Sequence, residues 1–208
     1  MKKTLTIVMA MVLVAAVAVT GTLAYMSTQS GAVTNTFTFG NMSITLDESE
    51  VKDDGTLNKD VRVPSNEYKV IPGATVAKDP TVHVEVGSEK CYVYVAVQNN
   101  LVIGANTVAS YTPNSDWEEV GKIADKNVTI YKYVKGDGIV DASSARQSLT
   151  PVFEEVTFDG ENITLGNKDS LDGKTIVIKA YAHQSESLDS TFDVDAAAIN
   201  HFTTEFGA

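Results

Sequence analysis

Three histidines and their neighbouring carboxylates are the residues of this sequence best suited to metal chemistry. His83 and Glu85 lie two residues apart in the segment His83-Val84-Glu85. Because side chains alternate along a strand, both are expected on one strand face. His183, in another predicted strand, could complete a set of three ligands, the number that a catalytic zinc site usually takes from the protein. These three residues are candidate metal ligands, and the alternative is a polar, solvated strand face.

The local sequence patterns of common hydrolases are missing from this chain. His83, His183 and His201 are far apart, so the helical zinc-protease motif with two histidines four residues apart is absent. There is no Gly-x-Ser-x-Gly nucleophile elbow. Cys91 lies in a predicted strand without an evident base beside it, so it is expected to be a small buried residue, with a reactive thiol or an intermolecular disulfide as the alternative. A single cysteine excludes an intramolecular disulfide.

The acidic residues also give only weak binding signals. Asp189, Asp193 and Asp195 alternate in a predicted loop and are calcium candidates, but the glycine and the final glutamate of an EF-hand are missing. The pair Asp47-Glu48 points to opposite strand faces by its spacing, and we interpret it as a solvated edge. We therefore expect a protein that is not an enzyme and needs no cofactor.

The elements that would position these side chains are mainly β-strands, because the dominant hydrophobic period beyond the N-terminal segment is two. Three alternating runs predict central strands around residues 91–97, 128–134 and 176–182. Asp-Gly pairs, which favour tight turns, separate such runs. One helix is predicted from Asp195 to Phe202, with Asp193 or Asp195 as its cap. Many short strands with frequent turns favour an all-β fold, an antiparallel β-sandwich with a short C-terminal helix.

The first 24 residues have the pattern of an export signal. Lys2 and Lys3 precede an apolar run from Leu5 to Val19, and cleavage is predicted between Ala24 and Tyr25. The alternative is a permanent membrane anchor, because the apolar run approaches the length that spans a bilayer. We expect residues 25–208 to form a single domain, secreted to the cell surface or the extracellular matrix. The formal charge of -11 makes nucleic acid an improbable partner.

A second N-terminal pattern predicts two strands joined by a turn at Gly40-Asn41. The segment Val33 to Phe39 alternates, with Val33, Asn35, Phe37 and Phe39 on one face and three threonines on the other. The segment Ile44 to Glu48 is the second strand. A strand near a chain terminus can pair with its own sheet or with another copy of the protein, and both possibilities stay open.

Several motifs, taken in order, resemble the TasA/camelysin (CalY) family of secreted Gram-positive proteins. They are Gly-Thr-Leu-Ala-Tyr at 21–25, Thr-Asn-Thr-Phe-Thr-Phe-Gly-Asn at 34–41, Ile-Thr-Leu-Asp-Glu at 44–48, Ile-Pro-Gly-Ala-Thr-Val-Ala-Lys-Asp-Pro at 71–80 and Ile-Lys-Ala-Tyr-Ala-His-Gln at 178–184, with the segment 196–202 near the end. No motif is identified between residues 99 and 148.

The resemblance implies a jelly-roll-like sandwich that a SipW-type signal peptidase processes during export. It also implies assembly of many copies into biofilm-matrix fibres, with other matrix components as further partners. It implies donation of the N-terminal strand at 33–39 as the mode of assembly, and contact with the membrane only through the uncleaved signal. Camelysin-type members are classed as metalloproteases, so a secreted metal-dependent protease is the alternative function. An adhesin or ligand-binding module that binds as a monomer is a third.

Overall fold

The structure is a computed structural model that describes residues 41–52, 54–164, 166–186 and 191–207, all of which belong to one unit of the chain. Its longer strands are β1 (Ile44–Val51), β2 (Leu57–Val63), β4 (Thr81–Val84), β5 (Cys91–Asn99), β9 (Trp117–Ile123), β10 (Val128–Tyr133), β12 (Glu155–Phe158) and β13 (Ile176–Gln184). Its shorter strands are β3 (Thr75–Ala77), β6 (Val102–Ile103), β7 (Asn106–Thr107), β8 (Ala109–Ser110) and β11 (Gln147–Ser148). Two short 3-10 helices, at Ala124–Lys126 and Lys168–Leu171, and the helix α2 (Val194–Gly207) complete the described elements.

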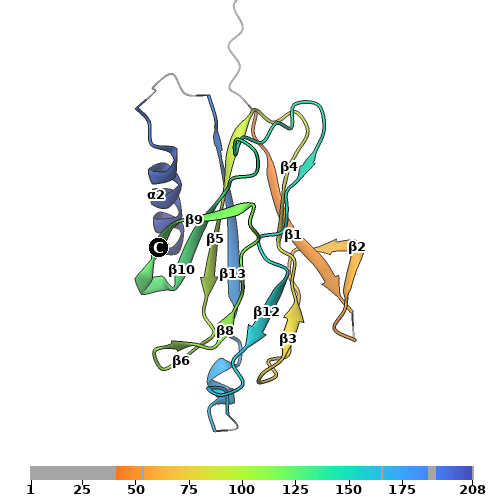
Figure 1. Ribbon diagram of the computed structural model, residues 1–208, viewed down its shortest axis with the longest axis vertical. Coiled ribbons are helices and arrows are strands. Elements are labelled where there is room, and N and C mark those ends of the chain that lie inside the picture. Colours follow the sequence, from red (N-terminus) through yellow and green to blue (C-terminus); the bar gives the residue numbers. More distant parts are fainter. Residues whose placement is uncertain (1–40, 53, 165, 187–190, 208) are drawn as a thin grey trace, which may run out of the picture. The chain divides into compact units, whose positions relative to one another are not determined.

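The strands form antiparallel sheets that pack face to face (Figure 1). One sheet has the order β13-β5-β10-β9. Facing it are the sheet β11-β4-β1-β2 and the small sheet β3-β12-β8. All strand pairs in these sheets are antiparallel. The predicted all-β sandwich with a C-terminal helix is therefore confirmed, while its jelly-roll connectivity stays a prediction.

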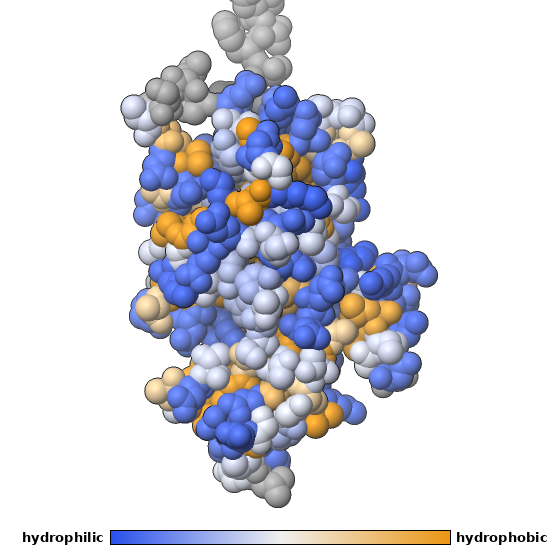
Figure 2. Space-filling model, viewed as in Figure 1, coloured by the Kyte–Doolittle hydropathy of each residue, from blue (hydrophilic) through white to orange (hydrophobic). Residues whose placement is uncertain are grey.

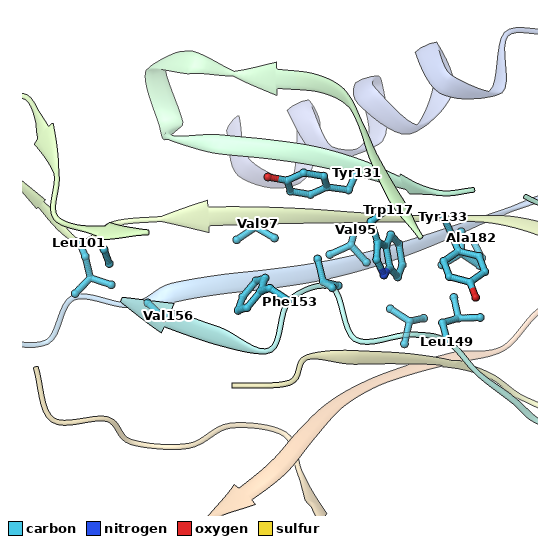
Figure 3. Packing of buried hydrophobic residues seen from close by; sticks show 14 of the residues in the cluster. Val95, Val97, Leu101, Trp117, Tyr131, Tyr133, Leu149, Phe153, Val156 and Ala182 are labelled. Atoms are coloured by element: carbon cyan, nitrogen blue, oxygen red, sulfur yellow. The ribbon is translucent and has the colours of Figure 1, made fainter. Parts of the chain in front are cut away.

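Strand β5 lies between two separate cores because its side chains alternate between them. Cys91, Val93, Val95 and Val97 face the core between the sheets, where they pack with residues of β4, β12 and β13 (Figure 3). Tyr94 and Ala96 face the opposite side and pack beneath α2. The predicted alternation of β5 is thus confirmed, as is that of β10, whose Tyr131 and Tyr133 face the first core and whose Val128 and Ile130 face the second.

Helix α2 covers the outer face of the β13-β5-β10-β9 sheet. The carboxylate of Asp193 accepts hydrogen bonds from the backbone N–H groups of Asp195 and Ala196, each at 3.0 Å, which caps the helix as expected. Phe202 is fully buried against the sheet. Gly121 on β9 lets the helix approach, because a Cβ at this position would lie 3.0 Å from the Ile199 side chain. The helix is longer than predicted, since it runs on to Gly207.

The predicted cleavage site at Ala24 and Tyr25 and the predicted strand from Val33 to Phe39 lie outside the described residues. The second predicted N-terminal strand, Ile44 to Glu48, is confirmed as the first part of β1. Within the described part of the chain, no helix has the length and apolar character to cross a membrane.

The helix core gives a direct stability test. Replacing Phe202 with alanine should lower the free energy of unfolding by about 3–5 kcal/mol, because the side chain fills a closed site between α2 and the sheet. Chemical denaturation followed by circular dichroism measures the loss. Asn200→Ala, at an exposed position of the same helix, is the control and should change stability little. Equal effects of both changes would contradict the packing of α2.

Candidate functional site

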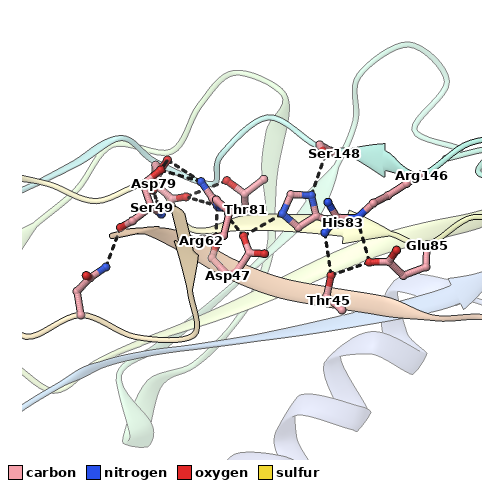
Figure 4. Close-up of polar contacts among 11 residues, drawn as sticks. Thr45, Asp47, Ser49, Arg62, Asp79, Thr81, His83, Glu85, Arg146 and Ser148 are labelled. Carbon is pink, nitrogen blue, oxygen red and sulfur yellow. Dashed lines mark hydrogen bonds and ion pairs between the residues drawn. The ribbon is translucent and has the colours of Figure 1, made fainter. Parts of the chain in front are cut away.

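A polar network covers the outer face of the β11-β4-β1-β2 sheet, opposite the core (Figure 4). Val82 and Val84 of β4 point into the core, so His83 between them points outward, yet only 5% of it is exposed. Its Nε2 lies 2.9 Å from Asp47 Oδ1, and its Nδ1 lies 2.8 Å from Ser148 Oγ. A carboxylate only accepts hydrogen bonds, so Nε2 carries the hydrogen and Nδ1 accepts from the serine hydroxyl when the ring is neutral. His83 thereby ties β1, β4 and β11 together.

Arg62 of β2 joins this network to the segment before β4. Its Nε donates to Asp47 Oδ1 at 2.7 Å, and its Nη1 donates to Asp79 Oδ2 at 2.9 Å. Asp79 also accepts hydrogen bonds at 2.7 Å from the backbone N–H and the hydroxyl of Ser49. The register between β1 and β2 shifts after Ser49, where Ser49 pairs with Arg62 but Glu50 pairs with Asn58. The network is therefore anchored at an irregularity of the strand pair.

The charges of the network favour the ionised form of Asp47. Burial alone would raise the pKa of this carboxyl, but hydrogen bonds from His83 and Arg62 outweigh burial and hold the pKa below its ordinary value. Asp47 therefore stays negative beside the arginine. The arrangement is a closed set of charge-assisted hydrogen bonds that holds four strand segments in place.

The structure places the candidate metal ligands His83 and His183 on two different sheets. His83 and Glu85 do lie on the same side of the sheet, but Glu85 accepts hydrogen bonds from Thr45 and Arg146 and does not bond to His83 (Figure 4). His183 lies on β13 next to Ala182, whose side chain faces the core. The side chain of His183 therefore points to the other face, which is the outer face of the β13-β5-β10-β9 sheet. Its ring stacks on Phe192 with the centroids 5.1 Å apart. Two sheets thus separate His183 from His83.

The remaining candidate residues have structural surroundings. Of the calcium candidates, Asp189 lies outside the described residues, Asp193 caps α2, and Asp195 pairs with Lys132 at 2.8 Å. Cys91 is fully buried, as expected, and burial raises the pKa of its thiol to about 11. Among the described residues no group of three or more His, Cys, Asp or Glu side chains is placed to hold a metal ion.

A groove of about 580 Å³ opens between the sheets beside β13. Apolar side chains from four strands line one part of it: Leu46 of β1, Val76 of β3, Val156 and Phe158 of β12, and Ile176 and Ile178 of β13. Polar side chains, among them Asn66, Glu67, Asp172 and Lys174, line the rest. Figure 2 shows a mostly hydrophilic face with several hydrophobic patches, one of them toward the end that carries β3, β8 and β12. The groove therefore has an apolar part, formed by these strands, and a polar part.

Polar side chains line the groove as well, and three of them, Lys78, Glu48 and Tyr68, form one cluster. Lys78 Nζ makes an ion pair with Glu48 Oε2 and lies 4.9 Å from the centre of the Tyr68 ring, whose hydroxyl also donates to Glu48 at 3.4 Å. Burial, and then the charge of Glu48, raise the pKa of Tyr68, so the phenol stays protonated. Glu48 is only 4% exposed. The expectation of a solvated edge at Asp47-Glu48 is therefore wrong, because the opposite directions of the two side chains lead into two different polar clusters.

The two edges of the sheet β13-β5-β10-β9 differ in character. At one end β9 presents Glu118, Glu119 and Lys122, which are exposed charges of the kind that discourage strand pairing. At the other end β13 is nine residues long and pairs only with β5 among the described residues. The long edge of β13 lies directly beside the apolar part of the groove, since Ile176 and Ile178 of β13 line the groove.

Comparison of the chain with protein-family models, with curated proteins and with solved structures found no match. The resemblance to the TasA/camelysin family therefore depends on the sequence motifs described above.

Sequence reasoning missed Arg62, Lys78, Tyr68 and Asp79 as members of polar clusters. One signal was present in the chain, because Thr45, Asp47 and Ser49 alternate with Leu46 and Glu48 along β1 and mark a polar strand face. The partners come from other segments, so the pairing becomes visible only in the folded chain.

The network on the outer face makes the free energy of unfolding depend on pH in the acidic range. Because folding lowers the pKa of Asp47, its contribution is fully present above the unfolded value of about 4 and is lost as the pH falls through the lower folded value. Asp47→Asn should lower the free energy of unfolding by about 1–3 kcal/mol at pH 7 and weaken its dependence on pH below about 4.

Urea denaturation at a series of pH values measures both effects. Glu85→Gln is the matched control, because Glu85 also pairs with an arginine but lies in the exposed part of the network, where little change is expected. An Asp47→Asn protein with the same acid sensitivity as the unchanged chain would contradict the role given to Asp47.

Proposed function

We propose that this protein is a secreted structural subunit of extracellular or biofilm-matrix fibres, of the TasA/camelysin type. In this proposal a SipW-type signal peptidase cleaves between Ala24 and Tyr25 during export. The segment from Val33 to Phe39 of one copy then pairs with a neighbouring copy. The observation that carries the proposal is the long edge of β13, which has no partner strand among the described residues and lies beside the apolar part of a groove.

The edge and the groove suit the two properties of the predicted strand. Backbone N–H and C=O groups along a free strand edge can extend the sheet by one strand, which is a common mode of peptide recognition. The predicted strand has seven residues, and β13 has nine. The apolar face of the predicted strand, with Phe37 and Phe39, would meet the apolar part of the groove. Burial of each phenylalanine would contribute about 1.5–3 kcal/mol.

The same contact explains growth into fibres. The donating segment and the accepting edge are different surfaces, so the contact is heterologous, and repeated heterologous contacts give an open filament unless they close into a ring. An uncleaved signal would tether the segment to the membrane, so processing would start assembly. Other matrix components are possible further partners.

The first test removes the apolar side chains from the strand. The processed chain, starting at Tyr25, should form filaments in electron micrographs. The double change Phe37→Ser and Phe39→Ser should abolish them, because both anchors for the groove are lost. Thr36→Ser with Thr38→Ser, on the opposite predicted face, is the matched control and should leave filaments intact. Filaments that persist in the phenylalanine variant would contradict the proposal.

A second test addresses the accepting side. A chain that starts at Gly40 keeps the groove but lacks the donating strand, so a small fraction of it should stop the growth of filaments of the processed protein. The same shortened chain with Ile178→Lys, which places a charge in the groove, should no longer stop growth. Light scattering during assembly measures both. Equal effects of the two shortened chains would exclude β13 and its groove as the acceptor.

A further inference from the structure

The ion pair in the groove has hydrogen-bonding capacity left over. Among the described residues, Glu48 accepts its bonds from Lys78 and Tyr68 through Oε2, and no bond to Oε1 is found. Lys78 Nζ has three hydrogens, of which its described hydrogen bond to Glu48 uses one. Within the lining of the groove, this ion pair therefore offers an acceptor oxygen and a donor ammonium group side by side. Buried polar groups of this kind are costly to leave unpaired when a partner covers them.

A side-chain amide matches this pair of groups. Its carbonyl oxygen accepts a hydrogen bond and its NH₂ group donates one. The predicted donating strand carries one amide, Asn35, on the same face as its two phenylalanines. Glutamate and lysine carry opposite charges here, so a neutral amide meets both without an uncompensated charge.

The spacing also agrees. Lys78 and Val76 are two residues apart and both line the groove. Val76 pairs with Val156 of β12, and Phe158 lies two residues further on. Along the groove, the polar position at Lys78 is thus followed by the apolar positions at Val76 with Val156 and at Phe158, in steps of two residues. Asn35, Phe37 and Phe39 follow one another at the same step, about 6.6 Å along a strand.

We propose that Glu48 and Lys78 recognise the side-chain amide of Asn35 from a second copy of this chain and so set the register of the inserted strand. This inference rests on the proposed function. In this register Phe37 and Phe39 lie over the apolar end of the groove, near Val156 and Phe158. A strand shifted by one residue would turn threonines toward the groove.

The decisive test is Asn35→Leu in the processed chain, measured as the critical concentration for filament formation by sedimentation. Loss of the amide leaves the groove's polar groups unpaired, so the critical concentration should rise about tenfold. A groove that recognises only apolar surface would bind leucine more tightly, and the critical concentration would fall. Thr36→Leu, on the opposite predicted face, is the control and should change it less than about twofold.

A charge exchange tests proximity. Asn35→Asp should raise the critical concentration, because the second carboxylate oxygen of the new side chain would face the carboxylate of Glu48. Adding Glu48→Gln should reverse this effect, because the pair then has one carboxylate, on the strand, and one amide, in the groove. Thermal unfolding of the monomers checks that Glu48→Gln folds. Tyr68→Phe combined with Asn35→Asp is the control, because it changes the same cluster but keeps the repulsion between the carboxylates at positions 35 and 48.

The outcomes separate the two proposals. A lower critical concentration for Asn35→Leu, or a folded double variant without rescue, overturns the role of Asn35 while filaments still form. An unchanged processed chain that stays monomeric at every concentration overturns the proposed function and this inference together.

Discussion

The structure depends on one constraint, which is that strand β5 must bury both of its faces. Its valines lie in the core between the sheets, and its Tyr94 and Ala96 lie under α2. A single sheet of this size could not cover both faces, so the chain provides a second sheet on one side and a helix on the other. The hydroxyl of Tyr94, which donates to Asp195 at 2.6 Å, satisfies its polar end at the helix boundary.

The sandwich is closed unevenly around this strand. On the helix side, Phe202 and Ala198 are fully buried, and the core is complete. On the side of β13, Ile176 and Ile178 are only partly buried and line a groove. Exposed charged residues occupy the opposite edge at β9, whereas the edge of β13, which has no partner strand among the described residues, lies beside apolar side chains. The incomplete burial at β13 is the reason that the proposed function is placed there.

The sequence predicted the parts of the fold that depend on local alternation. The two faces of β5 and β10, the strand at Ile44 and the cap at Asp193 follow from spacing and side-chain type, and the structure confirms them. The polar clusters could not be predicted in the same way. Asp47 and Glu48 are adjacent, yet Asp47 meets Arg62 outside the sandwich and Glu48 meets Lys78 inside it. These partners come from distant segments, so their pairing depends on sheet register, which sequence alone does not fix.

The buried thiol of Cys91 has a consequence for the whole molecule. Its side chain is inaccessible, and its high pKa keeps it protonated near neutral pH. While the fold is intact, Cys91 therefore offers no accessible thiolate to attack a disulfide or to react with an oxidant. The cysteine therefore stays a free thiol in reducing and oxidising surroundings alike for as long as the unit is folded.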